Sequence, residues 1–215
     1  MKHFPRPLAV LLFLLINTLA VFAQAQKTED EANAFTALEQ KSDALLKQTP
    51  HRERTTTELY DAGTKTPKST IVSVYETVTP DRSRYAVTFD SSGLVGRSET
   101  IRIGQKRYRR DASGNWQLDD SKIVTGGGGG AAEGATFVEK TTLDGRAVVV
   151  YDRKSFTADS GVDYDTATRY WFDEQKGRLL KKEARRRNQK TGELARIVTV
   201  YEYDPKITIE GPVIR

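Results

Sequence analysis

Cysteine is absent from the 215-residue sequence, and histidine occurs only twice. Without cysteine no disulfide can form, so the hydrophobic core must hold the fold together. A lipid anchor on a cysteine side chain is excluded as well. Because His51 is the only histidine beyond residue 3, the usual zinc sites and the histidine-dependent nucleophile arrangements are also excluded. We therefore expect no metal, no cofactor and no catalysis of these kinds.

Long apolar runs are scarce too, and the one that stands out is LAVLLFLLINTLAV near the N-terminus. It follows a basic head with Lys2 and Arg6, and small residues come after it. A signal peptidase could cut after Ala23 or after Ala25, so the order indicates a cleaved secretory signal over residues 1–25. An uncleaved membrane anchor is the alternative, but a run of about 14 residues is shorter than a bilayer span. We expect a soluble exported protein, periplasmic or extracellular.

The excess of positive over negative charge is small. The formal net charge is +5 and falls by two, to +3, when Lys2 and Arg6 leave with the signal. That is well short of the basic excess of a nucleic-acid-binding protein. The remaining chain, residues 26–215, is long enough for one hydrophobic core in a single domain.

The segment from Gln26 to Gln48 has the apolar spacing of an amphipathic helix. Thr49 and Pro50 end it. The stripe is expected to pack on the rest of the domain, and it consists of Ala32, Phe35, Leu38, Leu45 and Leu46.

Beyond Arg52 the sequence is typical of an antiparallel meander. Short runs rich in Thr, Val, Ile, Tyr and Phe are separated by turn-forming residues. In one run Tyr85, Val87 and Phe89 alternate with more polar residues, which gives that strand one apolar face. The expected strands are 54–62, 69–78, 84–90, 98–104, 105–111, 116–118, 136–143, 146–153, 167–174, 178–186 and 193–204.

Residues 125–135 read TGGGGGAAEGA and interrupt the meander. A phosphate-binding glycine loop would need a helix directly afterwards and usually a Gly-Lys-Ser/Thr ending, and the sequence has neither. The composition predicts a flexible loop or linker. A mobile flap over a cavity is the alternative.

Residues 178–187 read RLLKKEARRR and form the most basic stretch of the chain. In a strand, Lys182 and Arg186 share one face with Leu180 and Ala184, so neither face is wholly cationic. This is typical of a solvated hairpin strand. A surface for an anionic lipid or an acidic partner is the alternative.

Two longer motifs resemble a known family. IRIGQKRYRRDASGNWQL contains Gly104, Tyr108 and Trp116, and RYWFDEQKGRLLKKEAR follows later in the chain. Their order, after a signal and a helix, resembles the outer-membrane lipoprotein carrier superfamily. That group includes mycobacterial lipid-binding lipoprotein relatives and the amino-terminal domains of envelope-stress sensors. The residues of the later hairpin that match are Trp171, Phe172, Asp173, Gly177, Leu179 and Lys181.

The resemblance implies a mainly β fold with α: an incomplete, strongly curved antiparallel β-barrel covered by the N-terminal amphipathic helix. An apolar cavity between sheet and helix would take acyl chains. Arg52 or Arg54 would hold the helical lid shut. For the strand 69–78, Ile71 and Tyr75 are an alternative to Val72 and Val74. The candidate cavity residues are Phe35, Leu38, Val72, Val74, Tyr85, Val87, Phe89, Ile101, Ile103, Tyr170 and Trp171.

The leading hypothesis for function is binding of a lipid or lipoprotein acyl chain by a monomeric envelope carrier or chaperone. The alternative is a ligand-free interaction or stress-sensor module of the same fold with a membrane-protein partner. A carboxylate-only hydrolase is a third class, but no spacing marks a catalytic pair, so we expect no enzyme. The aspartates considered for it are Asp111, Asp119, Asp120, Asp163 and Asp165.

Overall fold

The computed structural model describes residues 6–91, 94–111, 113–120, 129–159 and 162–214. One helix, α1 (Arg6–Gln48), precedes a 12-stranded sheet. The strands are β1 (His51–Tyr60), β2 (Ser69–Thr79), β3 (Arg82–Ser91), β4 (Leu94–Ile103), β5 (Lys106–Arg110), β6 (Trp116–Leu118), β7 (Gly129–Ala132), β8 (Thr136–Leu143), β9 (Arg146–Asp159), β10 (Val162–Asp173), β11 (Leu179–Asn188) and β12 (Leu194–Tyr203).

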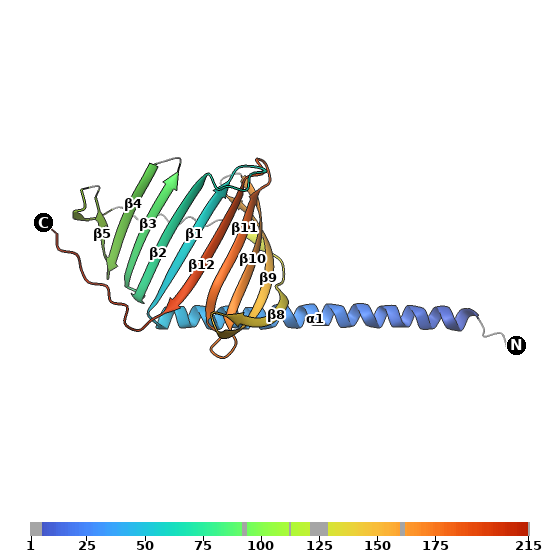
Figure 1. Cartoon of the computed structure of the whole chain (residues 1–215). Coiled ribbons are helices and arrows are strands. Elements are labelled where there is room, and N and C mark those ends of the chain that lie inside the picture. Colours follow the sequence, from blue (N-terminus) through green and yellow to red (C-terminus); the bar gives the residue numbers. More distant parts are fainter. Residues whose placement is uncertain (1–5, 92–93, 112, 121–128, 160–161, 215) are drawn as a thin grey trace.

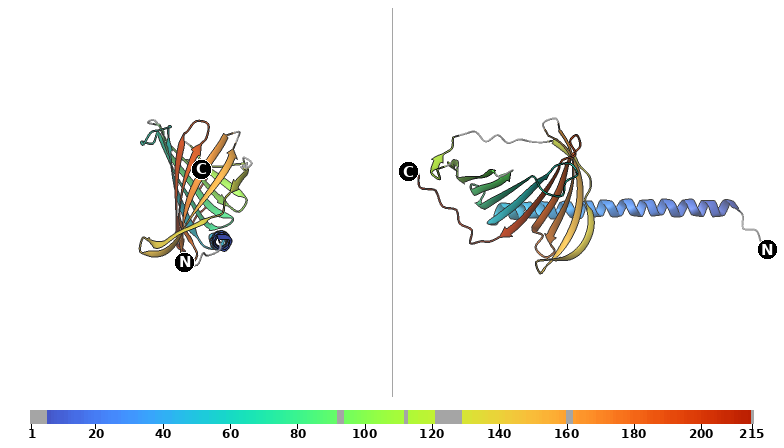
Figure 2. Two further views of the ribbon diagram at one scale, coloured as in Figure 1. Left: turned by 90° about the vertical axis from the view of Figure 1, so that its right-hand side faces the viewer. Right: turned by 45° about the horizontal axis from the view of Figure 1, so that its top comes forward.

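The sheet is antiparallel throughout and remains open. Its order is β6-β5-β4-β3-β2-β1-β12-β11-β10-β9-β7, and β8 also pairs with β9. Neighbours in the sheet are therefore neighbours in the chain, except where β1 meets β12 and where β7 pairs with β9. The strands fan out and twist strongly without closing into a barrel (Figures 1 and 2). The predicted curved half-barrel with a helix is confirmed.

The register divides the sheet into two faces, because directly opposed residues point to the same side and successive residues alternate. We call the side that α1 packs against the helix face; Tyr151, Tyr170 and Tyr201 lie on it. We call the other side the charged face. Ion pairs follow it across the sheet, and they include Arg52–Glu76 at 2.7 Å, Arg196–Glu183 at 3.0 Å and Arg169–Asp152 at 2.7 Å.

The main core lies between α1 and the helix face. Phe35 is only 3% exposed and meets the rings of Tyr151, Tyr170 and Phe172 edge-to-face at centroid distances of 5.0 to 5.9 Å. Such ring pairs add about 0.5–1.5 kcal/mol each beyond area burial. Phe35, Leu38 and Leu46 recur at helical spacing, so the predicted apolar stripe does pack on the sheet.

The helix ends at Gln48, as predicted, but it begins at Arg6 and includes most of the expected signal segment. Figure 1 shows that its N-terminal part projects beyond the sheet, with only the later turns against the strands. Residues 1–5 lie outside the described ranges, and signal cleavage stays a prediction. Among the residues whose side chains are described, no helical segment is long and apolar enough to span a membrane.

The glycine-rich segment differs in part from the prediction. Residues 125–128 lie outside the described residues, but Gly129–Ala132 form β7 and pair with residues 155–158 of β9. Residues with little or no side chain have low strand propensity, so this pairing depends on the neighbouring edge of β9 rather than on local sequence.

The basic stretch forms β11 within the sheet, as expected for a hairpin strand. Its cations are divided between the two faces. Lys181 lies over the Trp171 ring at 4.5 Å on the charged face, and Arg186 lies over the Tyr164 ring at 3.7 Å on the helix face. No continuous cationic surface results.

A buried hydrogen bond from the sheet to α1 predicts a stability effect. The backbone N–H of Leu179 donates to the Ser42 hydroxyl at 3.0 Å, and Ser42 is 2% exposed. Ser42→Ala should lower the free energy of unfolding by about 1–3 kcal/mol, because the N–H is left buried without an acceptor. Urea unfolding measures this. Thr36→Ala removes an exposed hydroxyl from the same helix and should change stability by less than about 0.5 kcal/mol; equal losses in the two variants would contradict the assignment.

Candidate functional site

The apolar helix face continues past α1 onto strands that the helix does not cover. Tyr75, Tyr85 and Phe89 lie there with exposed fractions of 38%, 45% and 41%. The register places Tyr75 opposite Tyr85 and Phe89 opposite Ile71, so the exposed rings and Ile71 share one face of β2 and β3. Large exposed apolar groups that are contiguous mark interaction surfaces.

A glycine shapes the far side of this surface. Gly96 on β4 lies opposite Phe89, and a Cβ at Gly96 would lie 2.0 Å from the Phe89 ring. The ring therefore rests directly on the β4 backbone, a position that only glycine allows. Phe89 therefore extends the apolar surface of the helix face from β3 onto β4.

A cavity of about 270 Å³ lies where α1 ends and the uncovered surface begins. Leu46 comes from the last turns of α1, and Tyr75 brings one of the exposed rings to the cavity wall. The cavity thus connects the helix-covered core to the uncovered strands. Its lining residues are Asp43, Leu46, Lys47, His51, Tyr75, Thr77 and Pro80.

Burial affects the pKa of two groups in this part of the helix face, Tyr203 and His51. Burial raises the pKa of Tyr203 to about 12. Burial lowers the pKa of His51, but hydrogen bonds to Glu53 and to the Thr49 carbonyl outweigh it and leave the pKa above its ordinary value. The His51 ring is 4% exposed, with Nδ1 2.9 Å from the Thr49 oxygen and Nε2 3.4 Å from the Glu53 carboxylate. This part of the helix face is therefore poorly hydrated.

Arg153 on β9 holds α1 against the sheet. Its guanidinium lies over the Phe35 ring at 5.6 Å, and one of its nitrogens is 3.5 Å from the Glu39 carboxylate. A cation over an aromatic ring contributes about 0.5–1 kcal/mol where it is partly exposed. The sequence does not single out Arg153, because no local pattern indicates that β9 passes beneath the helix.

The predicted lid-locking arginines lie elsewhere. The Arg52 guanidinium contacts Glu76 and Glu202 on the charged face. Arg54, two residues further along β1, shares that face. The sheet backbone separates both from α1, so neither is placed to fasten the helix.

The structure brings six of the eleven predicted cavity residues together on the helix side. Phe35 and Leu38 come from α1, and Tyr85, Val87, Phe89 and Tyr170 come from the helix face. The other five, Val72, Val74, Ile101, Ile103 and Trp171, lie on the charged face.

Register explains this division. Val72 pairs with Thr88 and Val74 with Ala86, so both point away from Val87, whereas the alternative pair Ile71 and Tyr75 shares its face. Ile103 contacts the C-terminal tail instead, since a Cβ at Gly211 would lie 3.4 Å from it. Among the described residues, no group of three or more Asp, Glu or His side chains is placed to hold a metal ion.

No protein-family model matches the chain, and no curated protein sequence matches it. Solved structures do match. LprF from Mycobacterium bovis has 10% sequence identity and a TM-score of 0.48, with 82% of this chain and 95% of that chain covered. A putative outer membrane lipoprotein-sorting protein domain from Vibrio parahaemolyticus has 11% identity and a TM-score of 0.33, with 84% and 95% covered.

A LolA superfamily protein from Nitrosomonas europaea also matches, with 11% identity, a TM-score of 0.32 and coverage of 78% of this chain and 90% of that chain. The matches include the superfamily that the sequence resembles, and at these identities the similarity is one of fold.

The position of Arg153 predicts a change in helix opening. Arg153→Gln should speed amide hydrogen exchange in residues 35–46 by about fivefold, because about 1 kcal/mol of contact with Phe35 and Glu39 is lost. Arg52→Gln is the matched control on the opposite face and should leave exchange in α1 unchanged. Faster exchange in Arg52→Gln alone would show that Arg153 does not hold the helix.

His51 predicts a dependence of stability on pH. Its pKa in the fold lies above the unfolded value, so protonation stabilises the fold. The contribution is fully present below about pH 6.5 and is lost as pH rises through the folded pKa. Urea unfolding between about pH 5.5 and 8.5 should show a slope that His51→Gln abolishes. Identical profiles for the two proteins would contradict the assignment.

Proposed function

We propose that this chain is an exported cell-envelope protein that binds an acyl chain of a lipid or lipoprotein on the helix face and acts as a carrier or chaperone. One observation carries the proposal. The helix covers only part of the apolar face, which leaves Tyr75, Tyr85 and Phe89 exposed next to the cavity at the end of α1.

An acyl chain gains about 0.8 kcal/mol for each methylene that it buries. The uncovered surface offers a continuous path for it, from the cavity beside Tyr75 to Tyr85, Val87 and Phe89 along β3. The name of the Vibrio structure includes lipoprotein sorting. For this chain, the proposal of acyl-chain binding depends on the helix face.

A second function is favoured by the packing beneath α1. Phe35 is enclosed by three aromatic rings, and Phe172 below it is 1% exposed, so this part of the interior is filled. A filled interior suits a ligand-free interaction or stress-sensor module, in which the exposed rings contact a membrane-protein partner.

We propose binding without catalysis. Of the aspartates considered for a hydrolase, Asp111 and Asp119 lie beside β5 and β6, whereas Asp163 and Asp165 lie on β10. Six strands lie between β5 and β10 in the sheet, so a pair drawn from the two groups is too far apart for glycoside hydrolysis. Turnover of glycoside or ester substrates by the purified protein would overturn this proposal.

Native purification tests the carrier proposal directly. The protein is extracted with organic solvent and bound species are identified by mass spectrometry, followed by titration with a fluorescent fatty acid. We expect a bound phospholipid or acylated peptide. A ligand-free protein that also fails to take up the probe would favour the interaction module.

Substitutions at two adjacent positions test which face of the sheet binds the probe. Val87→Asp places a charge on the helix face and should weaken probe binding by about tenfold or more, since the burial of a valine side chain is lost. Thr88→Asp places the same charge on the charged face, where the side chain is exposed, and should leave binding unchanged. Equal effects would show that the probe does not use the helix face.

A further inference from the structure

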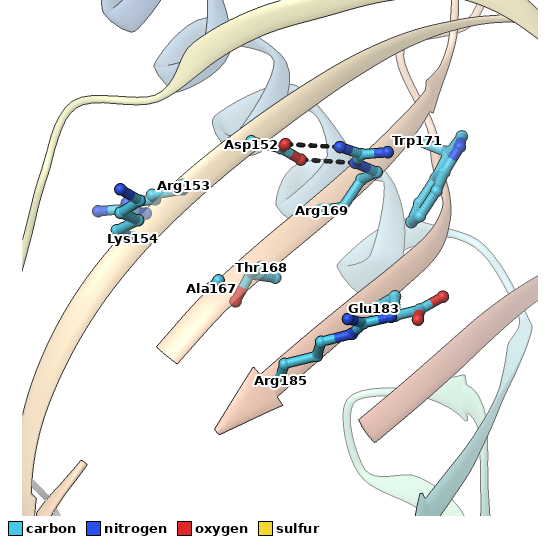
Figure 3. A pocket seen from close by; sticks show the side chains of 9 residues that line it. All are labelled: Asp152, Arg153, Lys154, Ala167, Thr168, Arg169, Trp171, Glu183 and Arg185. Atoms are coloured by element: carbon cyan, nitrogen blue, oxygen red, sulfur yellow. Dashed lines mark hydrogen bonds and ion pairs between the residues drawn. The ribbon is translucent and has the colours of Figure 1, made fainter. Parts of the chain in front are cut away.

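A second surface lies on the charged face, over β9, β10 and β11. Two cavities of about 390 and 530 Å³ adjoin there, and both are lined by Lys154, Ala167 and Arg185. Figure 3 shows the smaller one. The surface is on the side of the sheet opposite α1, so an inference from it is independent of acyl-chain binding.

The three shared residues form one row across three strands. Ala167 pairs with Lys154 on β9 and with Arg185 on β11, so all three point to the charged face. Adjacent strands are about 4.8 Å apart, which places the Cα atoms of the two cations about 10 Å apart with only a methyl group between them. The row therefore has a gap above Ala167 that two long cationic side chains flank.

Neither cation is neutralised by the part of the chain that the structure describes. Lys154 and Arg185 make no side-chain hydrogen bond or ion pair with any described residue, and both are exposed. The neighbouring row differs, because both oxygens of Asp152 accept from Arg169 at 2.7 Å (Figure 3). Glu183 in that row accepts from Arg196 at 3.0 Å. Positive charge on this part of the face is thus concentrated at the gap above Ala167.

Apolar groups adjoin the gap on its other side. Phe156 is 40% exposed and lines the larger cavity with Ala131, Ala132 and Leu194. Arg187 adds a third cation to that lining. Two carboxylates line it as well: Glu133, and Asp165, which accepts a hydrogen bond from Gln189 at 3.0 Å.

We propose that this row binds the phosphate group of an anionic phospholipid at a membrane surface. The ammonium of Lys154 and the guanidinium of Arg185 donate to the phosphate oxygens above Ala167, as charge-assisted hydrogen bonds. Phe156 lies beside them, where an aromatic ring suits the boundary between headgroups and acyl chains. The cavities are open and their cations exposed, so a headgroup in a flat membrane can reach them.

Vesicle binding by the full chain tests the proposal. Co-sedimentation at about 0.15 M ionic strength compares vesicles of phosphatidylglycerol and phosphatidylcholine with vesicles of phosphatidylcholine alone. We expect binding to the first only. The double variant Lys154→Gln, Arg185→Gln should bind about 30-fold more weakly, because each of the two basic residues usually contributes about fivefold to binding at an anionic surface.

Control variants test whether vesicle binding depends on this row or on positive charge in general. Arg54→Gln with Lys65→Gln removes two exposed cations elsewhere and should retain binding. Ala167→Glu fills the gap with a carboxylate and should lose binding while keeping the wild-type circular dichroism spectrum. Val87→Asp, on the helix face, should retain it.

Several results would overturn the proposal. These are equal losses in the two double variants, retained binding by Ala167→Glu, or equal binding to vesicles without phosphatidylglycerol. Displacement from vesicles by inorganic phosphate, at an ionic strength where chloride has no effect, would assign the row to a soluble phosphate instead. Failure to bind either vesicle would leave an acidic protein as the remaining partner for these cations and would equally end the lipid assignment.

Discussion

The pairing of β1 with β12 is the constraint on which the rest of the structure depends. It joins the strands of the two halves of the chain into one sheet, from His51 opposite Tyr203 to Tyr60 opposite Leu194, without a bulge. Since side chains alternate along a strand, this register decides which residues of both halves share a face. If β1 shifted by one residue against β12, Arg52 and Arg54 would lie under α1, and His51 and Glu53 would turn to the charged face.

The division into two faces also separates two kinds of chemistry. The helix face holds the aromatic rings that pack on α1 and those left exposed on β2 and β3. The charged face carries the ion pairs of Arg52, Arg169 and Arg196, whereas Lys154 and Arg185 have no ion-pair partner among the described residues. The two proposed ligands, an apolar chain and an anionic membrane surface, would therefore use opposite sides of the sheet and would not compete.

Local sequence predicted the end of α1, the strand segments and the antiparallel meander, because these depend on periodicity and turn residues. It could not decide the orientation of β2, since STIVSV has apolar residues at both alternating positions and only the partner strands distinguish Ile71 from Val72. It also missed Arg153, because the contact with Phe35 joins positions far apart in the chain. β7 escaped prediction because glycine and alanine have no strand preference of their own.

The distribution of contacts along α1 indicates how a ligand can enter. Phe35 and Ser42 are fastened by three aromatic rings, by Arg153 and by the buried hydrogen bond to Leu179. Leu46, four residues beyond Ser42, is only half-buried and already borders the open cavity. An acyl chain that displaced Phe35 would have to break its contacts with the three rings and Arg153, whereas one that enters beside Leu46 breaks none of them. For the proposed acyl-chain binding, we therefore expect entry at the end of the helix, with the rest of α1 staying on the sheet.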